Sequence, residues 1–170
     1  MVKNNSVGEI WVVGGFVYRN IIRSLYNITT VREPDIYFMV EELQEKIKLP
    51  KNWQITSTGL GSPKLIRNDG LIVDICPLSN MEYAIRKKLQ PTMELYLMNT
   101  PLNIQSIAFN MNKNCIMGDI GIKAILERKV IVNNMEEAQA LILRRKRFPS
   151  VNAFVRDKAE QIGFEAVLNL

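Results

Sequence analysis

I-W-V-V-G-G-F-V-Y-R-N-I-I, at residues 10–22, is the stretch that decides the fold of this chain. Its apolar, β-branched start predicts a buried strand that ends in a tight Gly14-Gly15 turn. Apolar residues then recur at helical spacing to residue 26, which predicts an amphipathic helix. A helix that begins directly after such a turn gathers backbone N–H groups at one point, an arrangement that suits a phosphate group.

The second decisive stretch is E-P-D-I-Y-F-M-V at residues 33–40, which predicts another strand from Asp35 onward. Side chains alternate along a strand, so Asp35 and Tyr37 point to the same face. Acids at both positions would offer two adjacent carboxylates to a pair of metal ions. Tyr37 instead supplies a neutral phenol, which is a poor ligand for Mg²⁺. The sequence therefore leaves two hypotheses open: the chain is catalytically active, or it keeps the fold of an enzyme without its activity.

The composition indicates one domain, or one domain with a small appendage. The chain has 170 residues, of which 47% are hydrophobic and 23% are charged, enough to fill a core and remain soluble. No apolar run approaches the roughly 18 residues that a membrane span needs. The first residues lack the apolar stretch of a secretion signal, so we expect a cytoplasmic protein with no membrane partner.

The absence of histidine narrows the chemistry that the chain can perform. Without histidine there are no His-based zinc sites, no Ser-His-Asp triads and no Cys-His pairs. Cys76 and Cys115 lack CxxC spacing, and isolated cysteines are more often small buried hydrophobes than ligands. Any catalysis must therefore rest on carboxylates, Lys, Arg, Tyr, Ser or a bound metal.

Positive charge is unevenly placed along the chain. The net charge is +5, and the densest basic cluster is Arg144, Arg145, Lys146 and Arg147. One interpretation is a solvated helix face. The other is a surface that contacts the phosphate backbone of a nucleic acid.

The pattern of the remaining chain predicts an α+β fold with a mixed sheet. It does not alternate as βαβ units do, which argues against a doubly wound parallel sheet. We expect a head at residues 1–134 and an all-helical, neck-like segment at residues 135–170. The expected strands are 53–58, 64–67, 71–76, 107–112, 115–118 and 129–132, and the expected helices are 41–48, 81–89 with Asn80 as cap, 121–127, 135–148 and 151–162.

Several segments, in order, carry a resemblance to a known family. They are V-V-G-G-F-V-Y-R-N-I-I at 12–22, P-D-I-Y-F at 34–38, L-I-V-D-I at 71–75, L-N-I-Q-S-I-A-F at 102–109, G-I-K-A-I at 121–125, L-R-R-K-R-F at 143–148 and I-G-F at 162–164. The chain resembles the head domain and the start of the neck of tRNA nucleotidyltransferases and poly(A) polymerases, in the polymerase β-like nucleotidyltransferase superfamily. The resemblance implies that fold and, in the family, a two-metal nucleotidyl transfer. It also implies a neck that is truncated here.

The resemblance assigns roles residue by residue. It implies that Asp35 and Asp74 correspond to the first and third metal-binding acids, and that Tyr37 replaces the second. Arg19 stands in place of an acid on the first helix. Asn99, Thr100 and Pro101 stand where the family has an Arg-Arg-Asp that reads the nucleotide. Gly14 and Gly15 match the phosphate-binding turn, and Arg144 and Arg147 match the neck arginines.

Three hypotheses follow from this mixture of kept and changed positions. The first is a pseudoenzyme that binds a nucleotide, a phosphate or an RNA end, with Gly14, Gly15 and Arg19 on phosphate and Arg144–Arg147 on RNA. The second is an active metal-dependent nucleotidyltransferase with an altered substrate. The third is a non-catalytic module for a protein partner or a homo-oligomer. Asp35 and Asp74 could hold one Mg²⁺ weakly or none, and Arg19 is the expected ion-pair partner of Asp74.

Overall fold

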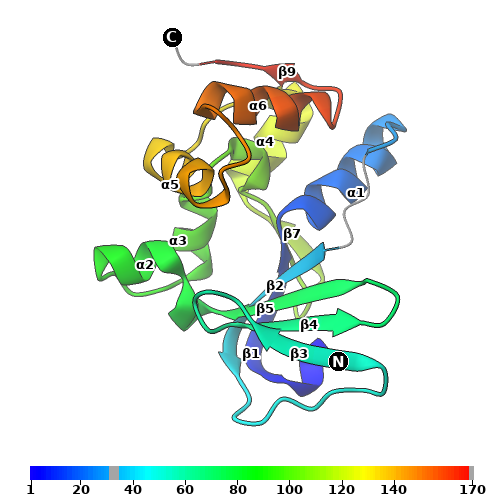
Figure 1. The fold of residues 1–170 in the computed structure, drawn as a ribbon. Helices are drawn as coiled ribbons and strands as arrows, with labels where there is room; N and C mark the ends of the chain where they lie inside the picture. Colours follow the sequence, from blue (N-terminus) through cyan, green and yellow to red (C-terminus); the bar gives the residue numbers. More distant parts are fainter. Residues whose placement is uncertain (31–34, 169–170) are drawn as a thin grey trace.

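The computed structural model describes residues 1–30 and 35–168. A seven-stranded mixed sheet has the order β3-β4-β5-β2-β1-β6-β7, with helices around it (Figure 1). The α+β prediction is confirmed. The strands are β1 Ser6–Val13, β2 Asp35–Leu43, β3 Trp53–Ser57, β4 Pro63–Arg67, β5 Ile72–Pro77, β6 Ala108–Asn110, β7 Cys115–Met117, β8 Lys129–Val130 and β9 Glu165–Ala166. The helices are α1 Gly15–Tyr26, α2 Glu82–Lys87, α3 Met93–Met98, α4 Asp119–Glu127, α5 Met135–Arg145 and α6 Val151–Glu160, with short 3-10 turns η1 Val2–Asn4, η2 Leu78–Asn80 and η3 Asn103–Gln105.

The middle of the sheet is a parallel pair inside an otherwise antiparallel arrangement. β1 pairs antiparallel with β2, and β2 pairs parallel with β5. The register places Val13 opposite Tyr37 and Tyr37 opposite Asp74. The turn at the end of β1 and the acidic positions of β2 and β5 are therefore brought to the same end of the sheet.

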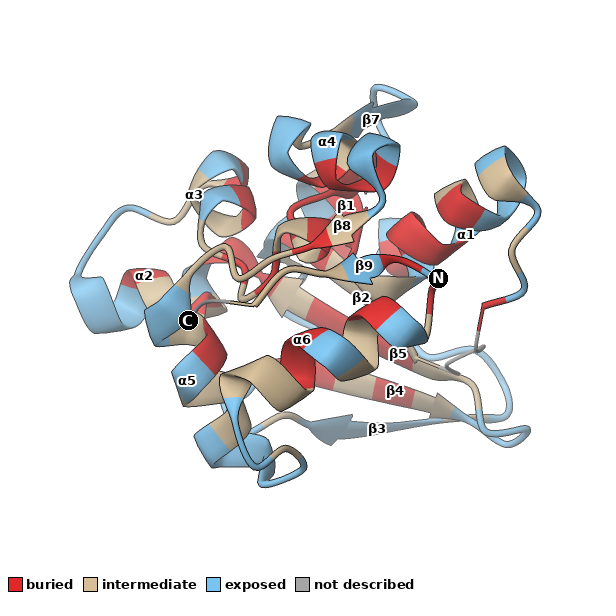
Figure 2. Ribbon diagram, turned by 90° about the horizontal axis from the view of Figure 1, so that it is seen from above, coloured by how far each residue is buried: buried red, intermediate tan, exposed pale blue. Residues whose placement is uncertain are grey.

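The two faces of the sheet are covered by different helices. α2 and α3 lie on one side of the sheet and α1 on the other, as Figures 1 and 2 both show. The first face packs Trp11, Val13 and Met39 against Met93 and Leu97 of α3. Tyr37 and Cys76 border that cluster. Helix α3 therefore covers this face of the sheet at β1. The end of the face that carries Tyr37 borders the candidate site.

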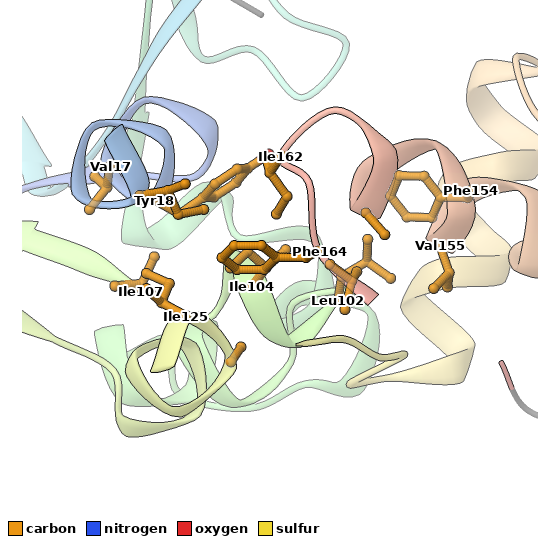
Figure 3. Packing of buried hydrophobic residues seen from close by; sticks show 14 of the residues in the cluster. Val17, Tyr18, Leu102, Ile104, Ile107, Ile125, Phe154, Val155, Ile162 and Phe164 are labelled. Carbon is orange, nitrogen blue, oxygen red and sulfur yellow. The ribbon is translucent and has the colours of Figure 1, made fainter. Parts of the chain in front are cut away.

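The largest core cluster joins the head to the C-terminal helices (Figure 3). It packs Tyr18 of α1 and Ile107 of the head with Phe154 of α6. Ile162 and Phe164, which follow α6, belong to the same cluster. The division at residue 134 remains a sequence-based prediction, and one core contains residues from both sides of it.

The chain after α6 returns to the head as a strand, so the expectation of helix alone after residue 135 is wrong. Gly163 adopts φ +67°, which favours glycine. The Phe164 N–H donates to the carbonyl of Ala159, which ends the helix as a capped turn. β9 then pairs parallel with β8. Backbone pairing adds to the buried apolar contacts that hold the C-terminal segment on the head.

Two further sequence predictions are wrong, each because tertiary contacts override local pattern. The helix predicted at 41–48 does not form. Residues 41–43 are the end of β2, because Glu42 and Leu43 pair with Val7 and Ser6 of β1, and residues 44–48 are neither helix nor strand. Asn80 does not cap α2. Its amide donates instead to the carbonyl of Leu60 and to the hydroxyl of Ser62. Within the described residues, no helix is long and apolar enough to cross a membrane.

The close approach of α4 to the loop after η3 yields a first testable prediction. A Cβ on Gly121 would lie 2.6 Å from the carbonyl oxygen of Ser106, whereas a Cβ on Gly59 would meet nothing within 4 Å. We expect Gly121→Ala to lower the free energy of unfolding by about 1–3 kcal/mol through overpacking. Gly59→Ala is the matched control, with an expected change within about 1 kcal/mol. Urea unfolding measures both, and equal stabilities would contradict this packing.

Candidate functional site

Three adjoining cavities form a cleft between the Tyr37 face of the sheet and helices α2, α3 and α5. Their volumes are about 450, 230 and 580 Å³. Glu82 of α2 and Tyr96 of α3 line all three cavities. We call these cavities together the cleft. They total enough space for a ligand of nucleotide size.

The floor of the cleft is made by Asp35, Tyr37 and Asp74. Asp35 and Tyr37 line the 450 Å³ cavity, and Tyr37 and Asp74 line the 580 Å³ cavity. In the parallel register, Asp74 lies opposite Tyr37, whereas Asp35 lies opposite Ile72. The phenol of Tyr37 therefore lies beside Asp74 of the neighbouring strand β5. Along β2, Tyr37 is two residues from Asp35.

Asp74 is a buried carboxylate with a weak set of partners. Its exposure is 5%, and its Oδ1 has no hydrogen-bond partner among the described residues. The nearest cation is the Nζ of Lys64, 3.8 Å from Oδ1. Burial raises the pKa of Asp74, and the charge of Lys64 opposes that rise. Burial in the site therefore destabilises the charged form of Asp74 relative to its protonated form.

The ion-pair partner of Asp74 is thus Lys64, not Arg19 as the sequence suggested. Lys64 lies directly opposite Asp74 in the β4–β5 pairing, so strand register delivers it. Arg19 is 6% exposed and packs under the first turn of α1. A Cβ on Gly15 would come within 2.5 Å of its two terminal nitrogens.

The phenol of Tyr37 remains neutral at physiological pH. Burial raises the pKa of Tyr37, and the charges of Asp74 and Asp35 raise it further. Arg145, at the end of α5, acts on the same phenol and lowers its pKa, which places a guanidinium beside the acidic floor. The positive charge of Arg145 therefore acts at the acidic floor, where it would disfavour a bound cation.

The Gly14-Gly15 turn forms the wall next to Asp35. Gly14 and Gly15 line the 450 Å³ cavity. Gly14 has φ +72° and precedes α1, and a Cβ there would meet nothing within 4 Å. The turn is open toward the cleft, while the Arg19 guanidinium lies behind it. The helix N-terminus makes this point electropositive.

The four basic residues at 144–147 do not lie on one helix, which corrects the expectation. α5 ends at Arg145, Lys146 adopts φ +50°, and Arg147 lies with its guanidinium 5.3 Å from the Phe148 ring centroid. Arg144, Arg145 and Arg147 line the 450 Å³ cavity. The chain changes direction at the end of α5, and the three arginines of this cluster all line the cleft.

An ion-pair network joins α5 of the neck to α2 of the head. Arg86 pairs with Glu137 and lies 3.2 Å from Glu136, and Lys87 lies 2.8 Å from Glu136. Arg144 pairs with Glu82 of α2. We call these pairs the α2–α5 network. It borders the cleft, because Glu82, Glu137 and Arg144 also line its walls.

The segment at Asn99, Thr100 and Pro101 is built into the structure by internal hydrogen bonds. The Thr100 hydroxyl is buried and lies 2.6 Å from that of Ser106. The Asn99 amide oxygen accepts from Asn134 at 2.9 Å. All three residues line the 230 Å³ cavity, but the side chains of Asn99 and Thr100 are used for packing the loop.

The sequence did not point to Tyr96 or Glu82 as residues of this cleft. Burial strongly raises the pKa of Tyr96, so its phenol is also neutral. Both residues lie on short helices, and only the fold brings those helices over the sheet. An acidic residue in the first turn of a predicted helix was the one feature of the sequence that could have pointed to Glu82.

The donor set on the floor does not fit a pair of divalent cations. Among the described residues, no three His, Cys, Asp or Glu side chains are grouped so as to hold a metal ion. Asp35 and Asp74 are accompanied by a neutral phenol, and Lys64 and Arg145 already bring positive charge to them. A second divalent cation would meet repulsion here without a second carboxylate pair to offset it.

No family model matches the sequence, and no curated protein matches it. Solved structures of CCA-adding enzymes do match it. The Thermotoga maritima CCA-adding enzyme complexed with tRNA gives a TM-score of 0.58 at 16% identity, over 94% of this chain and 35% of the enzyme. CCA-adding enzyme in complex with CTP, and with ATP, gives 0.58 at 19% identity, over 94% of this chain and 36% of the enzyme.

The chain has the nucleotidyltransferase fold. At this identity, the likeness establishes the fold and no activity. The matched region covers 94% of this chain but only 35% to 36% of the length of these enzymes.

The contrast between two aspartates gives a second prediction. Because the pKa of Asp74 is raised in the folded state, its charged form costs stability at pH 7, and that cost disappears below the unfolded pKa near 4. We expect Asp74→Asn to raise Tm at pH 7 by roughly 2–4 °C, equivalent to about 1 kcal/mol, with Lys64 left solvated. The gain should vanish as the pH falls toward 4.

Asp69→Asn is the control with the opposite sign. Arg67 and the Leu71 N–H lower the pKa of Asp69 to about 2, so the charged form stabilises the fold at pH 7. We expect its Asn variant to have a lower Tm at pH 7. Thermal melts followed by circular dichroism from pH 7 to 4 compare the two. A Tm for Asp74→Asn below that of the unmodified protein at pH 7 would contradict the conclusion that burial destabilises the charged Asp74 carboxylate.

Proposed function

We propose that this domain binds a nucleotide or another phosphate-bearing ligand in the cleft and does not transfer nucleotidyl groups. One observation carries the proposal. The phenol of Tyr37 stands beside Asp74, with Arg145 acting on it from the neck. A site with two separated carboxylates, a neutral phenol and two nearby cations is better matched to an anion than to two metal ions.

The electropositive part of the cleft supports a phosphate as the bound group. The N-terminus of α1 opens onto the cavity at Gly14-Gly15, and Arg145 and Arg147 line the same cavity from the opposite side. Backbone N–H groups and guanidinium forks are the usual partners of phosphate oxygens. In this proposal Arg19, whose guanidinium lies behind the turn, does not touch the ligand.

Aromatic side chains supply surface for the rest of the ligand. Tyr96 and Phe148, which are both half-buried, line the 450 Å³ cavity. A purine or pyrimidine can stack on such rings with little sequence preference. The CCA-adding enzymes of the same fold are described with CTP, ATP and tRNA. These complexes support a nucleotide or an RNA end as the ligand class.

The second candidate function is an active, metal-dependent transferase. It is favoured by the survival of Asp35 and Asp74 on one face beside the Gly14-Gly15 turn. In that case Asp35 and Asp74 would hold one Mg²⁺, with water as the remaining ligands. The two candidates differ in their requirement for metal and in whether product forms.

Calorimetry with ATP and CTP tests the proposed function. We expect binding in EDTA that changes little when Mg²⁺ is added, because the phosphate is held by N–H groups and guanidinium. The Arg145→Gln/Arg147→Gln variant should bind at least about tenfold more weakly, since two charge-assisted contacts are lost. Arg156→Gln, an exposed residue of α6 away from the cavity, is the matched control and should bind as the unmodified protein does.

An extension assay completes the test. With labelled ATP or CTP, Mg²⁺ and a tRNA or an RNA oligomer, we expect no extended product. Product that disappears in Asp35→Ala, together with strictly Mg²⁺-dependent binding, would favour the transferase instead. Triphosphate binding that is identical in the double arginine variant and in the Arg156→Gln control would remove the proposed phosphate site.

A further inference from the structure

One carboxylate lies at the point where the three cavities of the cleft meet. Glu82, in the first turn of α2, lines all three of them. Arg144, in the last turn of α5, lines the 450 and 580 Å³ cavities and forms an ion pair with Glu82. An anion and a cation of the protein therefore already meet in the wall that a bound ligand would face.

Arg144 differs in this respect from the two arginines assigned to the phosphate. Arg145 acts on a phenol of the cleft floor, and Arg147 lies over the ring of Phe148. Neither of these arginines forms an ion pair with an acid of the described residues, whereas Arg144 does. Carboxylates and phosphates bind a guanidinium group through the same N–H donors. The Glu82 carboxylate thus occupies the donors of Arg144 that a ligand phosphate would use.

The ion pair is exposed, so a ligand can displace Glu82 at small cost. The side chain of Arg144 is 55% exposed and that of Glu82 is 36% exposed. Exposed ion pairs contribute little to stability, because water solvates both groups when the pair opens. A second cation also remains for the released carboxylate, since Arg86, one turn further along α2, lies 3.8 Å from its other oxygen. Opening the pair therefore leaves no charge buried without a partner.

We propose that Glu82 is an internal competitor of the ligand in the cleft. In the free domain its carboxylate holds Arg144, and a phosphate group that binds takes this arginine and leaves Glu82 to Arg86 and water. The competition sets the apparent affinity by the fraction of molecules in which the pair is open. It also couples occupancy of the cleft to the contact between α2 and α5. This inference rests on the proposed function, because it concerns the same cleft.

Calorimetry with ATP in EDTA tests the competition in Glu82→Gln, because glutamine keeps the size of the side chain and removes its charge. We expect the Kd for ATP to fall by about three- to fivefold, the scale on which an exposed ion pair competes. The same variant should have a slightly lower Tm without ligand, since one link of the α2–α5 network is lost. Tighter binding by a less stable protein cannot result from improved folding. Weaker binding would make Glu82 a contact of the ligand and overturn the proposal.

Glu136→Gln is the matched control, because it removes the same charge from the same network without touching Arg144. Glu136 lies 3.2 Å from Arg86 and 2.8 Å from Lys87, and it lines none of the three cavities. We expect its Kd for ATP to stay within about twofold of that of the unmodified protein, since salt screens an exposed charge outside the cleft. An equal gain in both variants would mean that the loss of any negative charge near the cleft strengthens binding, and would overturn the proposal.

An Arg144→Gln background shows whether Arg144 is the group for which Glu82 and the phosphate compete. In that background Glu82→Gln should no longer strengthen ATP binding, because the contested cation is absent. A gain that persists without Arg144 would overturn the proposal. ATP binding to the unmodified protein that Glu82→Gln leaves unchanged would overturn this inference and leave the proposed function standing. No ATP binding by any variant would overturn the proposed function and this inference with it.

Discussion

The register between β2 and β5 is the constraint on which the site depends. It sets Tyr37 opposite Asp74, and the β4–β5 pairing in turn delivers Lys64 to that carboxylate. A slip of one residue would send these side chains to the opposite face and place Ile36 and Val73 in the cleft. The register is protected because the opposite face is filled by Val40, Leu65 and Ile75, which are fully buried. Apolar packing on one face thus fixes the polar chemistry on the other.

The neck is held to the head by two kinds of force that act in different places. Behind the cleft, Phe154, Ile162 and Phe164 share the main core with α1 and α4. Beside the cleft, the α2–α5 network joins the helices through exposed ion pairs that salt screens readily. The first contact anchors the C-terminal segment, and the second sets the distance of Arg145 from the acidic floor. The cleft wall is therefore the less strongly held of the two contacts.

The sequence was informative where local pattern and tertiary structure agree. The β1–turn–α1 unit and the strands predicted at 64–67 and 71–76 have strong local signals, and they form close to the expected bounds. Sequence reasoning failed at Glu41–Lys48, because strand pairing with β1 outweighs the helix propensity of that segment. It also missed the pairing of Lys64 with Asp74 and the place of Tyr96 in the cleft, since no motif marks either. Their roles arise from register and from helix packing, which pattern along the chain does not encode.

The phenol of Tyr37 has a consequence for how this cleft can change over evolutionary time. A mutation that introduced an acid at that position would add a carboxylate next to Asp74, whose burial already disfavours its charge. The cations that now neighbour it, Lys64 and Arg145, would bind the new acid in place of a metal ion. Two-metal chemistry in this cleft would therefore need changes on β2, β4 and α5 together. Each of these changes alone would leave the charges of the cleft unbalanced, so the present residues oppose a stepwise gain of a second metal ligand.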